Sequence, residues 1–153
     1  MMNLKESLLI LFLVILASIG GYFIASTTYE SNNVVKLSPI PELNEQILFE
    51  LIQDWRINQK LPPYIYSEKL CNFAKLRLKE IEVEFSHQGY YDHRKEINAI
   101  SLGENLAENQ PSEQHTLDMW VASPSHLKNL TTPFVYTCIK TEGQKAVQIF
   151  ANF

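Results

Sequence analysis

The sequence predicts an α+β domain, with helices packed on a small antiparallel sheet, preceded by an N-terminal transmembrane helix. Three observations support this prediction. One long apolar run lies near the N-terminus, two amphipathic patterns with helical spacing follow it, and two β-rich runs end the sequence. The predicted order after the apolar run is helix, helix, short strand, helix, strand, strand. A length of 153 residues leaves room for one domain and a short appendage.

Residues 8–25 form the predicted membrane segment. All of them are apolar except one serine and two glycines, and a helix of this length rises about 27 Å, close to the roughly 30 Å hydrocarbon core of a bilayer. Residues 1–7 would then lie in the cytoplasm. A cleaved signal peptide is the main alternative, although its apolar core is usually about 7–15 residues long and no clear Ala-x-Ala site follows here. A buried core helix is the remaining alternative. As an anchor or as a signal peptide, the segment would export the rest of the chain.

A tether is predicted between the membrane segment and the domain. Residues 26–40 are rich in serine, threonine and asparagine and contain a proline, a composition that favours a linker. The domain then covers residues 41–153. This is about 110 residues, enough for one modest hydrophobic core.

Two helices are predicted in the first half of the domain. The first begins at Pro41, which suits the first helical position, and ends before Leu61-Pro62-Pro63. Ser67 is the predicted N-cap of the second helix. The apolar stripe of this second helix consists of Leu70, Ala74, Leu78, Ile81 and Phe85. Gly89 then breaks the helical pattern, and a polar loop is predicted over residues 90–95.

The second half of the domain contains the predicted strands. Leu102, Glu104 and Leu106 would share one face of an extended chain, which favours a short strand over residues 101–107. A third helix opens at Pro111 and is predicted to stop at Pro124. Residues 134–141 and 146–153 are β-rich, and the polar segment between them is typical of a hairpin connection.

The composition excludes several classes of protein. A formal net charge of -4 disfavours nucleic acid as a partner, because binding phosphates needs a basic surface. A hydrophobic fraction of 46% excludes a disordered chain. Two cysteines are too few for a small disulfide-framework protein or a cysteine-rich zinc module.

Four motifs occur in a defined order along the domain. They are Ser86-His87, then Gly103-Glu104-Asn105-Leu106, then Trp120 followed by Ser123-Pro124-Ser125-His126, and finally Val147-Gln148-Ile149-Phe150. In this order they resemble the CAP superfamily of cysteine-rich secretory proteins, venom antigens and pathogenesis-related proteins, whose module is also called the SCP domain. The resemblance is closest to the compact bacterial members and covers residues 43–153.

The resemblance implies an α-β-α sandwich with a central cleft. In many members two histidines and two acidic residues line this cleft. Position by position, His87 and His126 match the two histidines, and Glu104 matches one acid. Ser123 stands where the second acid is expected, so the set of four is incomplete.

The chemistry of these side chains leaves two interpretations open. His87 and His126 are candidate ligands for a divalent metal such as zinc, with Glu104 orienting them or completing the site. Two imidazoles without firm carboxylate support would bind such an ion weakly. The other interpretation is a hydrogen-bonded polar cluster that holds no metal. No catalytic residue is assigned, because no acid is placed to orient a histidine toward the neighbouring serines.

The two cysteines carry a separate prediction. Cys71 lies in the second predicted helix and Cys138 in the first strand of the predicted hairpin. An exported domain meets an oxidising compartment, so a disulfide between them is expected. It would stabilise the fold by roughly 4 kcal/mol. Two buried free thiols are the alternative.

These observations predict a membrane-tethered, extracytoplasmic CAP domain that binds a ligand such as a lipid, a peptide or an envelope component. If the N-terminal segment is cleaved, the protein is secreted instead. The rival function is a divalent-metal-assisted hydrolase acting on peptide or cell-envelope material. A third possibility is a structural envelope protein in which the anchor matters more than the cleft.

Overall fold

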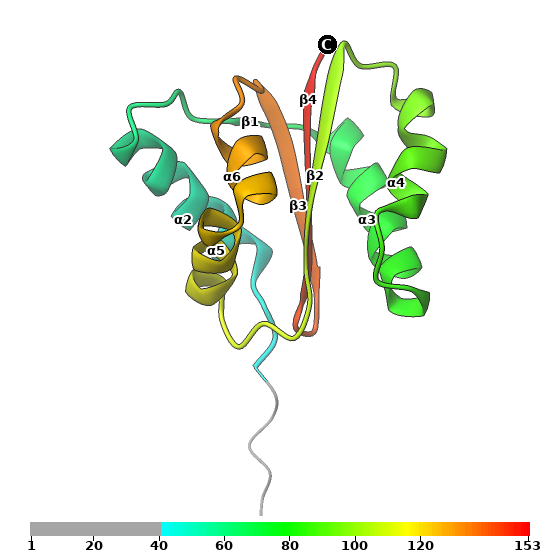
Figure 1. The fold of residues 1–153 in the computed structure, drawn as a ribbon, viewed down its shortest axis with the longest axis horizontal. Helices are drawn as coiled ribbons and strands as arrows, with labels where there is room; N and C mark the ends of the chain where they lie inside the picture. The colour runs from blue at the N-terminus through cyan, green and yellow to red at the C-terminus, as the bar shows by residue number, and fades with distance from the viewer. Residues whose placement is uncertain (1–40) are drawn as a thin grey trace, which may run out of the picture. The chain divides into compact units, whose positions relative to one another are not determined.

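The computed structural model of the chain describes residues 41–153, and Figure 1 shows the arrangement of their helices and strands. In chain order these elements are α2 (Glu45–Asn58), β1 (Ile65–Tyr66), α3 (Glu68–Val83), α4 (Gln88–His93), the 3₁₀ helix η1 (Arg94–Ile97), β2 (Ser101–Ala107), α5 (Glu113–Ala122), α6 (Pro124–Thr131), β3 (Tyr136–Glu142) and β4 (Lys145–Asn152). Within this part of the chain, no helix is long and apolar enough to cross a bilayer. The predicted cytoplasmic segment 1–7, anchor 8–25 and tether 26–40 lie outside the described residues.

A four-stranded sheet in the order β1-β3-β4-β2 forms the centre of the domain. Strands β3 and β4 form the predicted hairpin, which closes at the pair Glu142 and Lys145, and β2 lies antiparallel along the other side of β4. The predicted α+β class and these three strands are confirmed. Strand β1 was not predicted, and it pairs parallel to β3, so the sheet is mixed rather than purely antiparallel. Its two residues are too few to show an alternating pattern.

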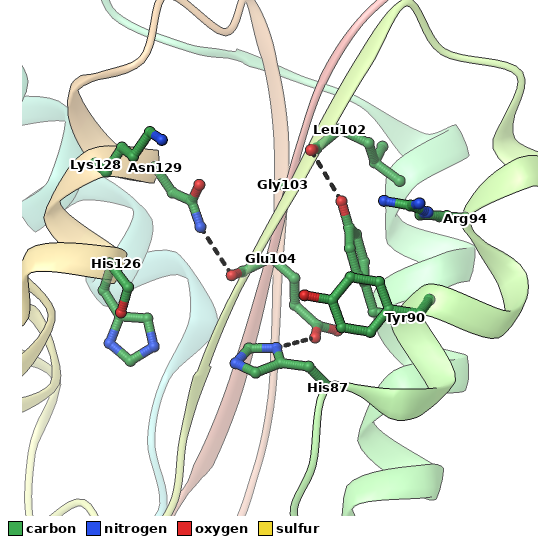
Figure 2. A pocket seen from close by; sticks show the side chains of 11 residues that line it. His87, Tyr90, Arg94, Leu102, Gly103, Glu104, His126, Lys128 and Asn129 are labelled. Atoms are coloured by element: carbon green, nitrogen blue, oxygen red, sulfur yellow. Dashed lines mark hydrogen bonds and ion pairs between the residues drawn. The ribbon is translucent and has the colours of Figure 1, made fainter.

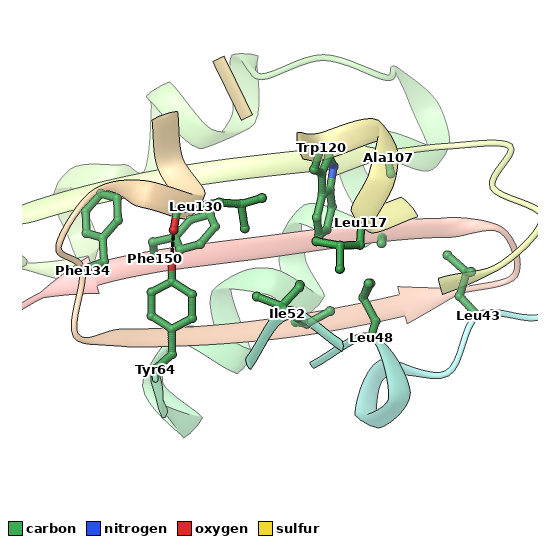
Figure 3. Close-up of a cluster of buried hydrophobic side chains, with 12 residues drawn as sticks. Leu43, Leu48, Ile52, Tyr64, Ala107, Leu117, Trp120, Leu130, Phe134 and Phe150 are labelled. Carbon is green, nitrogen blue, oxygen red and sulfur yellow. Dashed lines mark hydrogen bonds between the residues drawn. The ribbon is translucent and has the colours of Figure 1, made fainter. Parts of the chain in front are cut away.

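Helices cover both faces of the sheet (Figure 1), as the resemblance implies. Helices α2, α5 and α6 lie on one face, and α3 and α4 lie on the other. Each face has its own hydrophobic core. The first, shown in Figure 3, is built around Leu48, Ile52, Leu117, Trp120, Leu130 and Phe150. The second is built around Leu70, Phe73, Ala74, Ile81, Val147 and Ile149.

Helix α2 begins later than the predicted start at Pro41. The Asn44 side chain accepts hydrogen bonds from the backbone N–H groups of Gln46 (2.9 Å) and Ile47 (3.1 Å), so Asn44 is the N-cap and Glu45 the first helical residue. An asparagine that satisfies two free N–H groups is a stronger start signal than a proline that merely tolerates the position.

The last turn of α2 carries a buried arginine that ties this helix to α6. Arg56 is fully buried in the apolar stripe of α2. Its guanidinium donates to the carbonyl oxygens of Pro62 and Leu130 and to the Tyr64 hydroxyl. Because Leu130 lies in the last turn of α6, these bonds hold one end of the helix that carries His126.

The segment after α3 differs from the predicted polar loop. Helix α3 ends at Val83, so Phe85 lies beyond it and is 41% exposed, and residues 88–97 form α4 and η1. Gly89, predicted to break the helical pattern, lies inside α4. A Cβ atom at this position would collide with the Arg77 guanidinium and the Glu80 carboxylate. Glycine at this position therefore allows these side-chain ends to pack closely against the backbone and does not end a helix.

Pro124 ends one helix and also starts the next. Helix α5 stops at Ala122, as predicted, but α6 begins directly at Pro124 and was not predicted. Proline suits the first turn of a helix because its missing N–H would have no partner there. The motif Ser125-His126 thus lies in a helix, one turn before Asn129.

A disulfide joins Cys71 in α3 to Cys138 in β3. Both residues are fully buried, and their Cα atoms are 5.1 Å apart. The bond links a helix of the second core directly to the middle of the sheet. The expectation of a disulfide is confirmed.

Replacing Cys71→Ala together with Cys138→Ala is expected to lower the free energy of unfolding by about 4 kcal/mol, because the bond joins residues 67 apart in sequence. Urea unfolding of the full chain, followed by tryptophan fluorescence, measures the loss. Reduced wild-type protein is the matched control, and its urea unfolding midpoint should approach that of the double variant. Equal midpoints for oxidised and reduced wild-type protein would contradict a stabilising disulfide.

Candidate functional site

A cleft of about 470 Å³ opens at the free edge of the sheet, beside strand β2. Figure 2 shows its two walls: α4 and the turn before it form one, and α6 forms the other. The side chains that line it from the two walls are His87, Tyr90, Tyr91, Arg94, Ser125, His126, Lys128 and Asn129. The cleft therefore lies where the two helical layers meet past the edge of β2.

Side-chain donors from both layers occupy alternate carbonyl groups of β2. This strand has a neighbour on one side only, so the carbonyl groups on its other side have no strand to pair with. The donors are Tyr90 Oη to Leu102 O (2.9 Å), Asn129 Nδ2 to Glu104 O (2.9 Å) and Trp120 Nε1 to Leu106 O (3.0 Å). They fix the positions of α4, α5 and α6 against the floor of the cleft.

The Glu104 carboxylate is buried and has a partner for each oxygen. Arg77 Nε donates to Oε1 at 2.7 Å, and His87 Nδ1 lies 2.6 Å from Oε2. The side chains of Arg77 and Glu104 are both 1% exposed. Glu104 therefore holds one histidine in place and offers no free oxygen to the cleft.

Arg77 connects this carboxylate to the wall of the cleft. Its guanidinium also donates to Glu80 and to the carbonyl oxygen of Ser86 (2.6 Å), the residue before His87. Burial lowers the pKa of Arg77, but its hydrogen bonds and charge pairing with Glu104 and Glu80 raise it overall. The guanidinium remains charged and balances the charge of Glu104.

One ring nitrogen of His87 is hydrogen-bonded to Glu104, and the other can bind a ligand in the cleft. Its Nδ1 faces Glu104, and a carboxylate can only accept a hydrogen bond there, so Nδ1 carries the proton. In the neutral ring, Nε2 is then an acceptor. The side chain is 45% exposed, which makes this nitrogen accessible to a ligand.

His126 lies on the opposite wall (Figure 2), and no acid of residues 41–153 forms a hydrogen bond or an ion pair with its ring. Burial, and secondly the neighbouring His87, lower its pKa below the ordinary value of 6.5. Its helix is tied to β2 by two amides: Asn129 Nδ2 donates to Asn105 Oδ1 (2.9 Å), and Asn105 Nδ2 donates to the carbonyl oxygen of His126 (3.3 Å). His126 is thus a neutral, firmly placed imidazole at neutral pH.

The structure brings the three residues named from the motifs into one cleft. His87, Glu104 and His126 all line it, although Glu104 is hydrogen-bonded to only one of the two histidines. Ser123, at the position of the expected second acid, lies instead in the wall of a neighbouring apolar pocket.

The donors in the cleft do not fit a zinc site held by three protein ligands. Both oxygens of Glu104 are occupied, which leaves the two imidazoles. Among residues 41–153, no group of three His, Cys, Asp or Glu side chains is placed to hold a metal ion. The structure shows no hydrogen bond between a serine hydroxyl and a histidine ring within the same residues, so no serine is activated by a base.

Sequence reasoning missed two residues that build the site. Arg77 lies between Ala74 and Ile81 on the apolar stripe of α3, and a charged residue at such a position signals a buried ion pair. Asn129 follows His126 by three residues and so shares its helix face. Both signals are visible in the spacing alone.

Comparison with known proteins gives matches of structure only. No family model matches the chain, and no curated protein matches it. An extracellular protein containing a SCP domain from Bacillus anthracis str. Ames has a TM-score of 0.64 at 23% identity, over 71% of this chain and 40% of that one. A cysteine-rich secretory protein from Staphylococcus aureus subsp. aureus Mu50 has a TM-score of 0.65 at 16% identity, over 71% and 38%. Residues 41–153 have the SCP fold.

A third match is an outer surface protein from Borrelia burgdorferi, with a TM-score of 0.62 at 18% identity, over 73% of this chain and 97% of that one. The chain thus spans about two fifths of the first two proteins and nearly all of the third. The fold implied by the resemblance to the CAP superfamily is confirmed.

The substitution Arg77→Met is expected to cost about 3–5 kcal/mol in the free energy of unfolding, because it leaves the Glu104 carboxylate buried without its main cation. The double variant Arg77→Met/Glu104→Met removes both charges and should cost clearly less than the single one. Urea unfolding of the full chain measures both. Lys75→Met, an exposed position of the same helix, is the matched control. A cost below about 1 kcal/mol for Arg77→Met would show that the ion pair of Arg77 and Glu104 does not stabilise the fold.

Protonation of His126 is expected to destabilise the fold. Its pKa is lower in the folded state than in the unfolded chain, so the stability it contributes is present above pH 6.5 and is lost as the pH falls through the folded pKa. An NMR titration of the ring should show the lowered pKa directly, and His87→Gln should raise it. His115→Gln, an exposed histidine of α5, should leave it unchanged. A His126 pKa unaffected by His87→Gln would remove His87 as a cause and leave burial alone to account for the lowered pKa.

Proposed function

We propose that this protein is a membrane-tethered, extracytoplasmic SCP-fold module whose cleft binds a ligand without transforming it. One observation carries the proposal: the buried Glu104 carboxylate is fully used by Arg77 and His87, while the cleft above it stays open. The acid is a positioning residue for His87. The free polar groups of the cleft are suited to recognition.

Acid–base catalysis finds little support in this arrangement. A general base must reach the proton that it removes, and Glu104 is buried beneath the histidine that it holds. The alternative of a divalent-metal-assisted hydrolase would use His87 and His126 as ligands. It needs a third protein ligand, and the described residues around the cleft do not supply one.

The proposed location rests on two observations. The buried disulfide between Cys71 and Cys138 is a feature of proteins in oxidising compartments. The structures with the same fold are described as an extracellular protein, a secretory protein and an outer surface protein. The apolar segment 8–25 would then attach the domain to the membrane, or would direct its secretion if cleaved.

A cleft-blocking variant tests the proposal. Ser125 is exposed and lines the cleft, so Ser125→Trp should fill it without disturbing the core. Gln114→Trp places the same side chain on an exposed face of α5 and is the matched control. The probes, added singly, are peptidoglycan fragments, dispersed membrane lipids, a pool of short peptides and zinc chloride. The thermal unfolding midpoint of the full chain is measured with each.

At least one of the organic probes is expected to raise the midpoint of the wild type and of Gln114→Trp by roughly 5 °C at about ten times its dissociation constant. The same probe should leave Ser125→Trp unchanged. Equal shifts in all three proteins, or none with any probe, would refute a binding cleft. A shift with zinc that is lost in His87→Gln/His126→Gln would favour the hydrolase instead.

A further inference from the structure

The cleft carries positive charge that nothing in the described part of the chain balances. Arg94 from η1 and Lys128 from α6 are exposed on opposite walls (Figure 2), and neither forms an ion pair with another residue of 41–153. Among residues 41–153, Glu104 is the one acid that lines the cleft, and it is buried against Arg77, which also pairs with Glu80. Arg94 lies over the Tyr91 ring, 5.3 Å from its centroid, but it has no acidic partner within the described residues, and neither has Lys128. Such a surface attracts an anionic group.

An apolar pocket of about 320 Å³ lies beside the cleft and shares His126 with it. Phe85, Leu106, Met119 and Trp120 form most of its wall. Met119 is 49% exposed at this pocket, so part of its apolar surface faces water. The pocket has the size and lining to take one large apolar side chain.

Strand β2 sets the separation of the two sites. The charged cleft lies along residues 102–104, and the apolar pocket lies along residues 106–108. A strand rises about 3.3 Å per residue, so the two centres are roughly 13 Å apart. An extended chain covers this distance in about four residues, and side chains four apart point to the same side.

We propose that the ligand of the cleft is an extended acidic peptide segment. Its carboxylate lies in the cleft that Arg94 and Lys128 flank, and a large apolar side chain about four residues away fills the pocket at Trp120. This inference rests on the proposed function, because it names the ligand class of the same cleft.

The wall between the two sites favours a peptide over a lipid. His126 lines both sites, and Ser125 and Asn129 add polar groups on the cleft side of it. An acyl chain whose head group was held by the cations would have to cross this polar wall to reach the apolar pocket. It would displace water from the polar groups and offer them no hydrogen bonds, which costs free energy. A peptide backbone offers both N–H and C=O groups to the same wall, so it can pair with donors and with acceptors there.

Gln110 indicates which apolar side chain suits the pocket. It lines the pocket and is 8% exposed, and its Oε1 has no hydrogen-bond partner among the described residues. A buried acceptor without a partner is costly. A tryptophan or tyrosine supplies an N–H or O–H donor together with a large apolar surface.

The test uses a short fluorescein-labelled peptide with one glutamate and one tryptophan about four residues apart in a serine background. Fluorescence anisotropy with the full chain in a neutral detergent measures its dissociation constant. Arg94→Gln/Lys128→Gln is expected to weaken binding about tenfold. Lys95→Gln, which removes the same charge from the neighbouring exposed position, should change it less than about twofold. Added salt should weaken binding to the wild type.

Two changes in the peptide complete the design. Replacing its glutamate by glutamine should weaken binding to the wild type about tenfold and have little further effect on Arg94→Gln/Lys128→Gln, because the same interaction is already lost. Replacing its tryptophan by alanine should weaken binding to both proteins. Equal affinity of the wild type and Arg94→Gln/Lys128→Gln for the acidic peptide would overturn the inference.

A second probe separates this inference from the proposed function. If a fatty acid or a basic peptide binds and Ser125→Trp abolishes that binding, while the acidic peptide does not bind, the cleft is a binding site but the inference is wrong. If Ser125→Trp affects the binding of no probe, both are wrong.

Discussion

The buried pair of Arg77 and Glu104 is the interaction on which the arrangement of the domain depends. It joins helix α3 to strand β2 across the boundary between a helical layer and the sheet. The same arginine holds the backbone at Ser86, and the same carboxylate holds the ring of His87. Such pairs cost desolvation energy and add little net stability when compared with apolar packing. In this domain the ion pair instead fixes positions, because it holds both strand β2 and the ring of His87 in place.

The sequence was sufficient for the larger elements and insufficient for the short ones. Helices α2 and α3 and the β3–β4 hairpin repeat their patterns long enough to be recognised. Strand β1 has two residues and depends on pairing with β3, a contact distant in sequence. Helices α4 and α6 were missed because glycine and proline usually interrupt helices. Gly89 instead permits close packing against Arg77, and Pro124 occupies the first turn of a new helix.

The candidate site, like the fold, could be predicted from the sequence only in part. The motifs located His87, Glu104 and His126, and these three residues do line one cleft. What the motifs could not show is the balance of charge around them. That Glu104 is saturated depends on Arg77, which lies more than twenty residues away in sequence. That Arg94 and Lys128 have no acidic partner within residues 41–153 depends on where η1 and α6 meet the edge of the sheet. Both are properties of tertiary structure.

The side-chain donors along β2 have a consequence for the solubility of the domain. A strand at the edge of a sheet normally offers its backbone to any other extended chain, which is how sheets from separate molecules join and aggregate. Here Tyr90, Asn129 and Trp120 already occupy three alternate carbonyl groups of that edge. At the opposite edge, β1 covers only the first two residues of β3. On the β2 side, another extended chain finds these three carbonyl groups already used, which hinders copies of the domain from joining through that strand.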